Sequence, residues 1–198
     1  MAACGTHIEF EGEKLFELLL TKAQIEHILT VLRKHQIPMV LEGPNYIYVD
    51  EKDFKDDPYV IYLRNELGEN LKSITGTAQY EVNKLSAELG NADVELVRKE
   101  LGTEFDMIVH EPDGILEIGQ AGHSKASGIE RLCASLGIAK EDTYAFGDSA
   151  NDVEMLEFVA HGIAMGNGTD VAKNAAEFVT TDIHKDGIWN GLKHYGLI

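Results

Sequence analysis

The sequence predicts an α/β protein, and three observations point to this class. Short apolar segments alternate with amphipathic ones over the last third of the chain, which is typical of parallel βα units. A segment near the N-terminus combines a helix-capping sequence with apolar residues at helical spacing. Of the 198 residues, 44% are hydrophobic and 26% charged, with 19 Gly and only 4 Pro, which excludes collagen-like, low-complexity and disordered classes.

The net charge bears on the kind of partner. Lys and Arg number 17 and Asp and Glu 34, so the formal net charge is −17. Phosphate backbones and anionic lipids would repel such a surface, so neither nucleic acid nor a membrane is expected as a partner. A small phosphorylated metabolite can still bind where a divalent cation and a Lys reverse the local sign. No apolar run approaches the roughly 20 residues of a membrane span, the first residues lack a signal-peptide pattern, and a cytoplasmic protein is expected.

The first half of the chain contains several predicted elements. Thr21 begins a capping box with Gln24, and four apolar residues follow at helical spacing, so a helix is expected over 21–35. Asn91 is expected to cap a helix over 92–101 that Gly102 ends. Residues 51–80 give no clear prediction. The expected strands cover 8–10, 39–41, 46–49, 82–89, 105–109 and 115–118, the last two joined through a turn at 112–114.

The second half predicts a regular βα alternation. Ser124 caps a helix that Gly137 closes. After it, strands are expected at 143–146, 163–165 and 178–179, and helices at 153–158, at 171–176 and after Gly187. Since ligands bind beyond the carboxyl ends of the strands in such sheets, the loops after these strands are the places to look for chemistry.

A cluster of oxygen-bearing side chains follows the predicted strand at 143–146. Asp148 comes directly after Gly147, and Asn151 and Asp152 follow at the start of the next helix, three and four positions on. Side chains at this spacing share one face of a first helical turn, and two carboxylates with an amide suit Mg²⁺. The simpler interpretation, that both Asp residues cap a helix, has equal weight from the residues alone.

Lys125 is the second candidate. It lies in the first turn of a predicted helix, where the helix dipole disfavours a cation. A Lys at this position is explained if it faces concentrated negative charge, although most single Lys residues are solvated surface groups. Ser124, next to it, loosely imitates a serine-hydrolase motif, but an N-cap role explains it better.

Together these segments resemble a known family. Asp148-Ser-Ala-Asn151-Asp152, then Ile163-Ala-Met-Gly166-Asn167, with Ser124-Lys125 upstream, resembles the Cof-type branch of the haloacid dehalogenase-like (HAD) phosphohydrolases. The resemblance implies a partial Rossmann-like core with a parallel sheet and an inserted α/β cap. It implies residues 1–19 as a core segment leading into the cap, 20–113 as the cap and 114–198 as the C-terminal half of the core.

The resemblance also implies roles for the four residues. Lys125 would neutralise the phosphoryl group and act in catalysis, Asn151 would contact the phosphoryl group or the metal shell, and Asp148 and Asp152 would be the Mg²⁺ residues. The family transfers a phosphoryl group to an Asp in a D-x-D-G-[TV] motif, and water then hydrolyses the aspartyl-phosphate.

That nucleophile motif does not occur in this sequence. The closest imitation, at 111–115, begins with Glu and comes at the wrong place relative to Lys125. Two functions therefore stay open: a Mg²⁺-dependent phosphohydrolase of small phosphorylated metabolites, and a catalytically inactive remnant that binds a partner or ligand through its cap. An incomplete sheet would also expose strand edges, so self-association through the incomplete core is expected.

Overall fold

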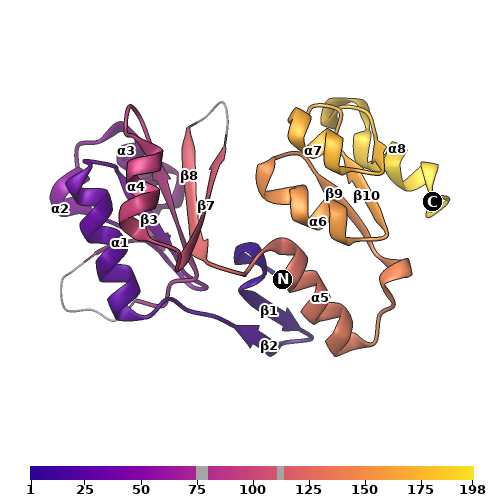
Figure 1. Ribbon diagram of the computed structural model, residues 1–198, viewed down its shortest axis with the longest axis horizontal. Helices are drawn as coiled ribbons and strands as arrows, with labels where there is room; N and C mark the ends of the chain where they lie inside the picture. Colours follow the sequence, from indigo (N-terminus) through magenta and orange to yellow (C-terminus); the bar gives the residue numbers. More distant parts are fainter. Residues whose placement is uncertain (75–79, 111–113) are drawn as a thin grey trace. The chain divides into compact units, whose positions relative to one another are not determined.

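The computed structural model describes residues 1–74, 80–110 and 114–198, and the chain divides into two compact units (Figure 1). One unit combines Met1–Leu15 with His123–Ile198, and the other is Phe16–Gly122. Both combine sheets with helices, so the predicted α/β class is confirmed. Within the described residues, no helix is both long and apolar enough to span a membrane.

The Phe16–Gly122 unit is built on a six-stranded sheet in the order β5-β4-β3-β6-β8-β7. All neighbours pair antiparallel except β4 and β5, which are parallel. The strands are β3 (Met39–Glu42), β4 (Ile47–Val49), β5 (Leu71–Ser73), β6 (Lys84–Glu88), β7 (Phe105–His110) and β8 (Ile115–Gln120).

Helices cover both faces of this sheet. Met39 and Leu41 belong to a core shared with α1 (Lys22–Lys34) and α4 (Val94–Leu101), while Val40, between them, packs with Val60 of α3 (Pro58–Leu67). This alternation is the period of two expected of a strand. The short helix α2 (Glu51–Phe54) and the 3₁₀ turn η2 (Gly68–Asn70) connect β4 to α3 and α3 to β5.

The capping predictions in this unit had different outcomes. The capping box at Thr21 is confirmed, since its backbone N–H donates to Gln24 Oε1 at 2.9 Å and its side chain accepts from the Gln24 N–H. The Asn91 cap is wrong. Asp93 caps α4, its Oδ1 accepting the N–H groups of Glu95 and Leu96 at 3.0 and 3.1 Å, and the helix begins two residues later than expected. Most of the turn expected at 112–114 lies outside the described residues.

The other unit contains three parallel strands in the order β11-β10-β9, which confirms the predicted alternation. The strands are β9 (Tyr144–Gly147), β10 (His161–Ala164) and β11 (Phe178–Val179), and the helices are α5 (Lys125–Leu136), α6 (Val153–Phe158), α7 (Asp170–Ala175) and α8 (Gly187–His194). Gly147 pairs with Ala164, so β9 and β10 end at the same edge. The loops after these two strands therefore meet there.

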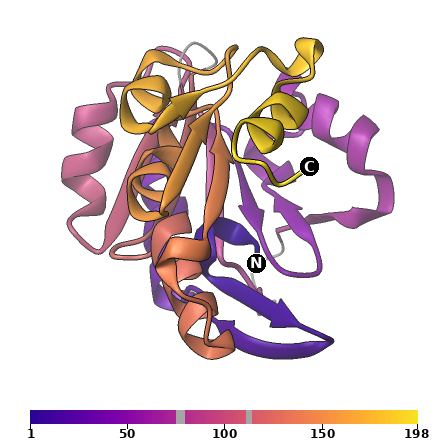
Figure 2. The ribbon, with the colours of Figure 1, turned by 90° about the vertical axis from the view of Figure 1, so that its right-hand side faces the viewer.

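Helices lie on both faces of this smaller sheet (Figure 2). Ala145 of β9 packs with Met155 and Val159 at the α6 side, and Ile129 of α5 joins them. On the other face α8 approaches so closely that a Cβ on Gly191 would lie 2.5 Å from a ring carbon of Phe146. The remaining elements are the hairpin β1 (His7–Phe10) and β2 (Glu13–Glu17), and the 3₁₀ turns η1 (Ala3–Gly5), η3 (Lys140–Asp142), η4 (Ala150–Asp152) and η5 (Ile183–Lys185).

The divisions between the units differ from those expected from the sequence. Along the chain, the divisions fall between residues 15 and 16 and between residues 122 and 123. The family resemblance implied divisions between residues 19 and 20 and between residues 113 and 114. The later division moves because β8, expected in the core half, pairs with β6 and β7 in the six-stranded sheet.

Candidate functional site

The candidate site begins where β9 ends. Gly147 is its last residue, and η4 leads through Asp152 into α6. A Cβ on Gly147 would lie 2.6 Å from Asp152 Cβ, closer than side chains approach one another. Position 147 therefore requires glycine, because only glycine leaves room for the Asp152 side chain.

Asp152 holds the loop together. It is 4% exposed, and its Oδ2 accepts the backbone N–H groups of Asp148 at 2.8 Å and Ser149 at 3.1 Å. Buried carboxylates require such partners. One oxygen of Asp152 is therefore engaged in fixing the peptide backbone on both sides of Asp148.

Lys125 reaches this loop from the first turn of α5. Its Nζ donates to Asp152 Oδ1 at 2.5 Å and to Asn151 Oδ1 at 3.0 Å. The sequence raised the question of why a Lys occupies a position that the helix dipole disfavours. The buried carboxylate of Asp152 provides the negative charge that compensates.

The electrostatics of Asp152 follow from these contacts. Burial alone raises the pKa of its carboxyl group. The hydrogen bond from Lys125, the backbone N–H of Asp148 and the Lys125 charge outweigh burial, so the pKa lies below its ordinary value. Asp152 is thus ionised at neutral pH.

Asn151 is oriented by two donors. Its Oδ1 accepts from Lys125 Nζ at 3.0 Å and from Ser149 Oγ at 2.9 Å. Because both donors converge on the oxygen, the amide nitrogen is turned away from Lys125. Ser149 was not singled out from the sequence, since a Ser in a polar turn carries no distinctive signal.

Asp148 differs from the other three. Asp148 is exposed, and its carboxylate has no hydrogen bond or ion pair with the residues the structure describes. Its backbone is held at both ends: the N–H donates to Asp152, and the C=O accepts the Thr169 N–H at 2.8 Å. Asp148 therefore presents an available carboxylate from a fixed backbone at the carboxyl edge of the sheet.

The oxygen atoms of this loop differ in how well they suit Mg²⁺. Mg²⁺ binds one or two carboxylates and completes its shell with water and substrate phosphate. The exposed carboxylate of Asp148 fits that chemistry, whereas both oxygens of Asp152 already have partners. Among the described residues no three His, Cys, Asp or Glu side chains gather as a ligand set.

Ser124 is the N-cap of α5. Its hydroxyl oxygen accepts the Ser127 N–H at 3.4 Å, and its own backbone N–H donates to Ser127 Oγ at 3.0 Å. This reciprocal capping confirms the N-cap prediction and accounts for the residue without a nucleophilic role.

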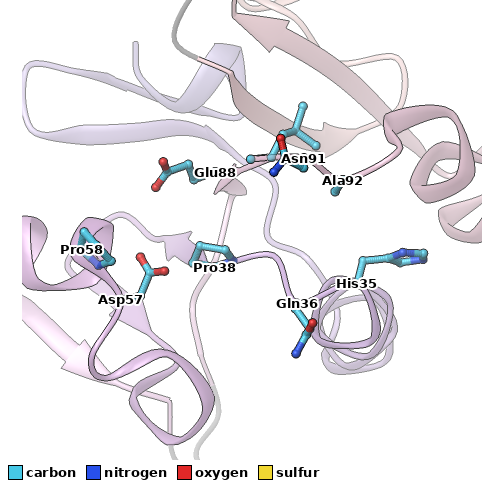
Figure 3. Close-up of a pocket in the computed structure, with 10 residues that line it drawn as sticks. His35, Gln36, Pro38, Asp57, Pro58, Glu88, Asn91 and Ala92 are labelled. Carbon is cyan, nitrogen blue, oxygen red and sulfur yellow. The ribbon is translucent and has the colours of Figure 1, made fainter.

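A cavity of about 420 Å³ lies in the Phe16–Gly122 unit (Figure 3). The carboxylates of Asp57 and Glu88 border it, and Asp57 Oδ1 also accepts the Tyr59 N–H at 2.9 Å. The four predicted site residues belong to the other unit and do not line it. The lining residues are His35, Gln36, Pro38, Asp57, Pro58, Glu88, Leu89, Gly90, Asn91 and Ala92.

Residues 1–192 match the family model described as haloacid dehalogenase-like hydrolase, so the chain belongs to that family. This confirms the resemblance found in the sequence.

Two of the curated relatives of the chain are named phosphatases. The chain is 36% identical to the 5-amino-6-(5-phospho-D-ribitylamino)uracil phosphatase YitU of Bacillus subtilis over 67% of its own length and 47% of YitU. It is 30% identical to a phosphoglycolate phosphatase of Halobacterium salinarum over 76% of each chain. A solved structure of a hypothetical protein from Geobacillus kaustophilus superimposes with a TM-score of 0.77 at 31% identity, covering 98% of this chain and 75% of that one. The chain thus spans about half of YitU and about three quarters of the other two.

Proposed function

We propose that the carboxyl edge of β9 forms part of the active site of a Mg²⁺-dependent phosphohydrolase that acts on small phosphorylated metabolites. The observation that carries the proposal is the position of Lys125 Nζ, 2.5 Å from Asp152 Oδ1 and 3.0 Å from Asn151 Oδ1. Through the bond from the Asp148 N–H to Asp152 Oδ2, all four residues expected at the site belong to one network.

Each residue has a separate part in the proposal. Asp148 would hold Mg²⁺ through its free carboxylate, and the ion, when bound, would neutralise charge on a phosphate ester. Lys125 would bind a phosphoryl oxygen as a point charge, and Asn151 would donate its amide to another. Asp152 accepts hydrogen bonds from Lys125 and from the Asp148 backbone N–H. It would therefore orient the metal shell indirectly, through these two residues.

The names of the relatives support the substrate class. The relatives from Bacillus subtilis and Halobacterium salinarum are each named a phosphatase of a small phosphorylated compound. The compound is a phosphoribitylaminouracil in the first name and phosphoglycolate in the second. A small phosphate monoester is therefore the substrate class we propose for the site, in agreement with a protein too acidic to attract nucleic acid. We further propose that the Phe16–Gly122 unit is the cap and that the other unit belongs to the core. The cytoplasmic location remains a prediction.

The proposed reaction needs a nucleophilic Asp. These 198 residues contain no D-x-D-G-[TV] sequence, so turnover would require an Asp supplied from outside them, and the chain alone would bind Mg²⁺ and phosphate with negligible hydrolysis. In the described part of the chain β9 is one of the two edge strands of the three-stranded sheet, with β11 at the other edge. We propose the β9 edge as the place where a further strand, or a second copy in self-association, would pair.

The second candidate function is an inactive remnant that binds a ligand or partner through its cap. The absent nucleophile motif favours it. Mg²⁺-dependent hydrolysis of p-nitrophenyl phosphate by the 198-residue chain separates the two, with Asp148→Asn as the control. Hydrolysis that Asp148→Asn abolishes would establish a phosphohydrolase. Without hydrolysis, Mg²⁺ binding that inorganic phosphate strengthens and Asp148→Asn weakens would support a phosphohydrolase site that needs an external Asp, and the absence of such binding would favour the remnant.

A further inference from the structure

The loop after β10 contacts the backbone of Asp148. The Asp148 C=O accepts the Thr169 backbone N–H at 2.8 Å and the Thr169 hydroxyl at 3.3 Å. Thr169 follows Asp148 by 21 positions, and the two meet because β9 and β10 end at the same edge of the sheet. One backbone carbonyl thus has two donors from a single residue of the neighbouring loop.

Gly168 makes this close approach possible. A Cβ at position 168 would lie 3.0 Å from both Cα and O of Asp148, and also 3.0 Å from Met165 O. The Gly168 N–H donates to that same Met165 O at 2.9 Å. The turn that presents Thr169 is therefore fixed in place, and a side chain at 168 would push it away from Asp148.

The Thr169 hydroxyl is not explained by helix capping. Thr169 occupies the N-cap position of α7, where a Thr side chain ordinarily accepts a backbone N–H of the first turn. Here it makes no such bond, and its hydroxyl donates to Asp148 O instead. This choice of partner points to a role at Asp148.

We propose that Thr169 is a positioning residue that aims the Asp148 carboxylate at the cation, an inference that rests on the proposed function of Asp148. The Asp148 side chain has no partner of its own among the described residues, so its direction follows from its backbone. Asp152 holds the N–H of that backbone and Thr169 holds the C=O. Groups that orient a metal ligand typically change metal affinity by about 10–100-fold when they are removed.

Isothermal titration of the full chain with MgCl₂ tests this role. Thr169→Val keeps the shape and removes the hydroxyl, and it should weaken Mg²⁺ binding about tenfold. Thr169→Ser restores the hydroxyl and should bind within about twofold of the parent chain. Thr30→Val is the matched control, because its hydroxyl donates to Glu26 O within α1 of the other unit and has no further partner among the residues the structure describes, and it should leave Mg²⁺ binding unchanged. Thermal unfolding without Mg²⁺ shows whether Thr169→Val still folds.

The outcomes separate this inference from the proposed function. If Mg²⁺ binds the parent chain and not Asp148→Asn, but binds Thr169→Val as tightly as the parent, the positioning role is wrong and the metal site stands. If Thr169→Ser is as weak as Thr169→Val, the hydroxyl is not the group responsible and the inference is again overturned. If the parent and Asp148→Asn give the same titration, the metal site itself fails, and the role of Thr169 fails with it.

Discussion

Lys125 and Asp152 lie 27 positions apart in the chain and form an ion pair at 2.5 Å between Nζ and Oδ1. The carboxylate side chain is 5% exposed and the Lys side chain 28%, so the pair is largely shielded from solvent. The second carboxylate oxygen fixes the backbone of Asp148. This pair therefore connects the start of α5 to the loop that presents the free carboxylate.

Asp152→Asn should destabilise the protein while Asp148→Asn should not. The first change removes the counter-charge of Lys125 and replaces one acceptor oxygen with an NH₂ donor, so the side chain can no longer accept from both Lys125 and the backbone. Breaking a pair of this kind costs about 3 kcal/mol. The second changes an exposed side chain without partners among the described residues, and should alter the free energy of unfolding by less than about 0.5 kcal/mol. Urea unfolding of both variants measures the difference. Equal free energies of unfolding for the two variants would contradict the stabilising role of Asp152 in this loop.

Acid should weaken the fold through Asp152. The pKa of its carboxyl is lowered in the folded state, so its stabilisation is complete above the unfolded pKa of about 3.9 and is lost as the pH falls through the lower folded pKa. The difference in unfolding free energy between the parent chain and Asp152→Asn should shrink between about pH 5 and pH 2. A difference that stays constant over that range would contradict the ion pair.

Glu177 should add a second acid-sensitive contact in the same unit. Its pKa is lowered, first by the hydrogen bond from His161 and then by that from Tyr195. Its stabilising effect should likewise be present above its unfolded pKa of about 4.3 and be lost as the pH falls through the folded value. Glu177→Gln should remove this part of the acid sensitivity and leave that of Asp152. Chemical shifts of the His161 ring, followed by NMR during an acid titration, report on it directly.

Ser124→Ala should cost about 1 kcal/mol, the usual effect of losing an N-cap. Because Ser124 serves α5 as its cap, a fluorophosphonate probe should leave the parent chain unlabelled. Covalent labelling of Ser124 would instead support the serine-hydrolase alternative.

Leu41→Ala should cost about 2–5 kcal/mol, because Leu41 of β3 is completely buried in the core that β3 shares with α1 and α4. Ile61→Ala is the control, since Ile61 is 43% exposed on α3, and it should cost less than about 1 kcal/mol. Urea unfolding of the two variants compares them. A small effect at Leu41 would contradict the placement of α1 over that face.

Local signals predicted the elements that end in strong caps. The Thr21 capping box begins α1 as expected. Gly137 ends α5 as expected, in the left-handed conformation that is common at a helix C-terminus. The helix α3 was missed because residues 59–63 are continuously apolar, a pattern that has no helical period, and of α3 only Val60 is buried. The prediction of Asn91 as the cap of α4 was wrong because Asp93, two positions on, is an equally good cap by residue type.

The structure brings the four residues singled out in the sequence into one hydrogen-bond network, but the geometry of that network and the contacts of Ser149 and Thr169 were not predicted. The resemblance to the family placed Lys125, Asp148, Asn151 and Asp152 together. One oxygen of Asp152 bonds Lys125 and the other bonds the backbone. This division depends on the orientation of the side chain, which the spacing of residues in the sequence does not determine. Thr169 was missed for the same reason, since its contact with Asp148 arises from the parallel pairing of β9 with β10.

The most direct test of the central claim is calorimetric titration of Mg²⁺ with and without inorganic phosphate, because it requires no nucleophile. In the parent chain, phosphate should strengthen Mg²⁺ binding, since both are proposed to share one site. Asp148→Asn should weaken Mg²⁺ binding at least about tenfold, and Lys125→Met should still bind Mg²⁺ but lose the effect of phosphate. Mg²⁺ binding that phosphate does not change in the parent chain, or that Asp148→Asn leaves intact, would contradict a shared metal and phosphate site at the end of β9.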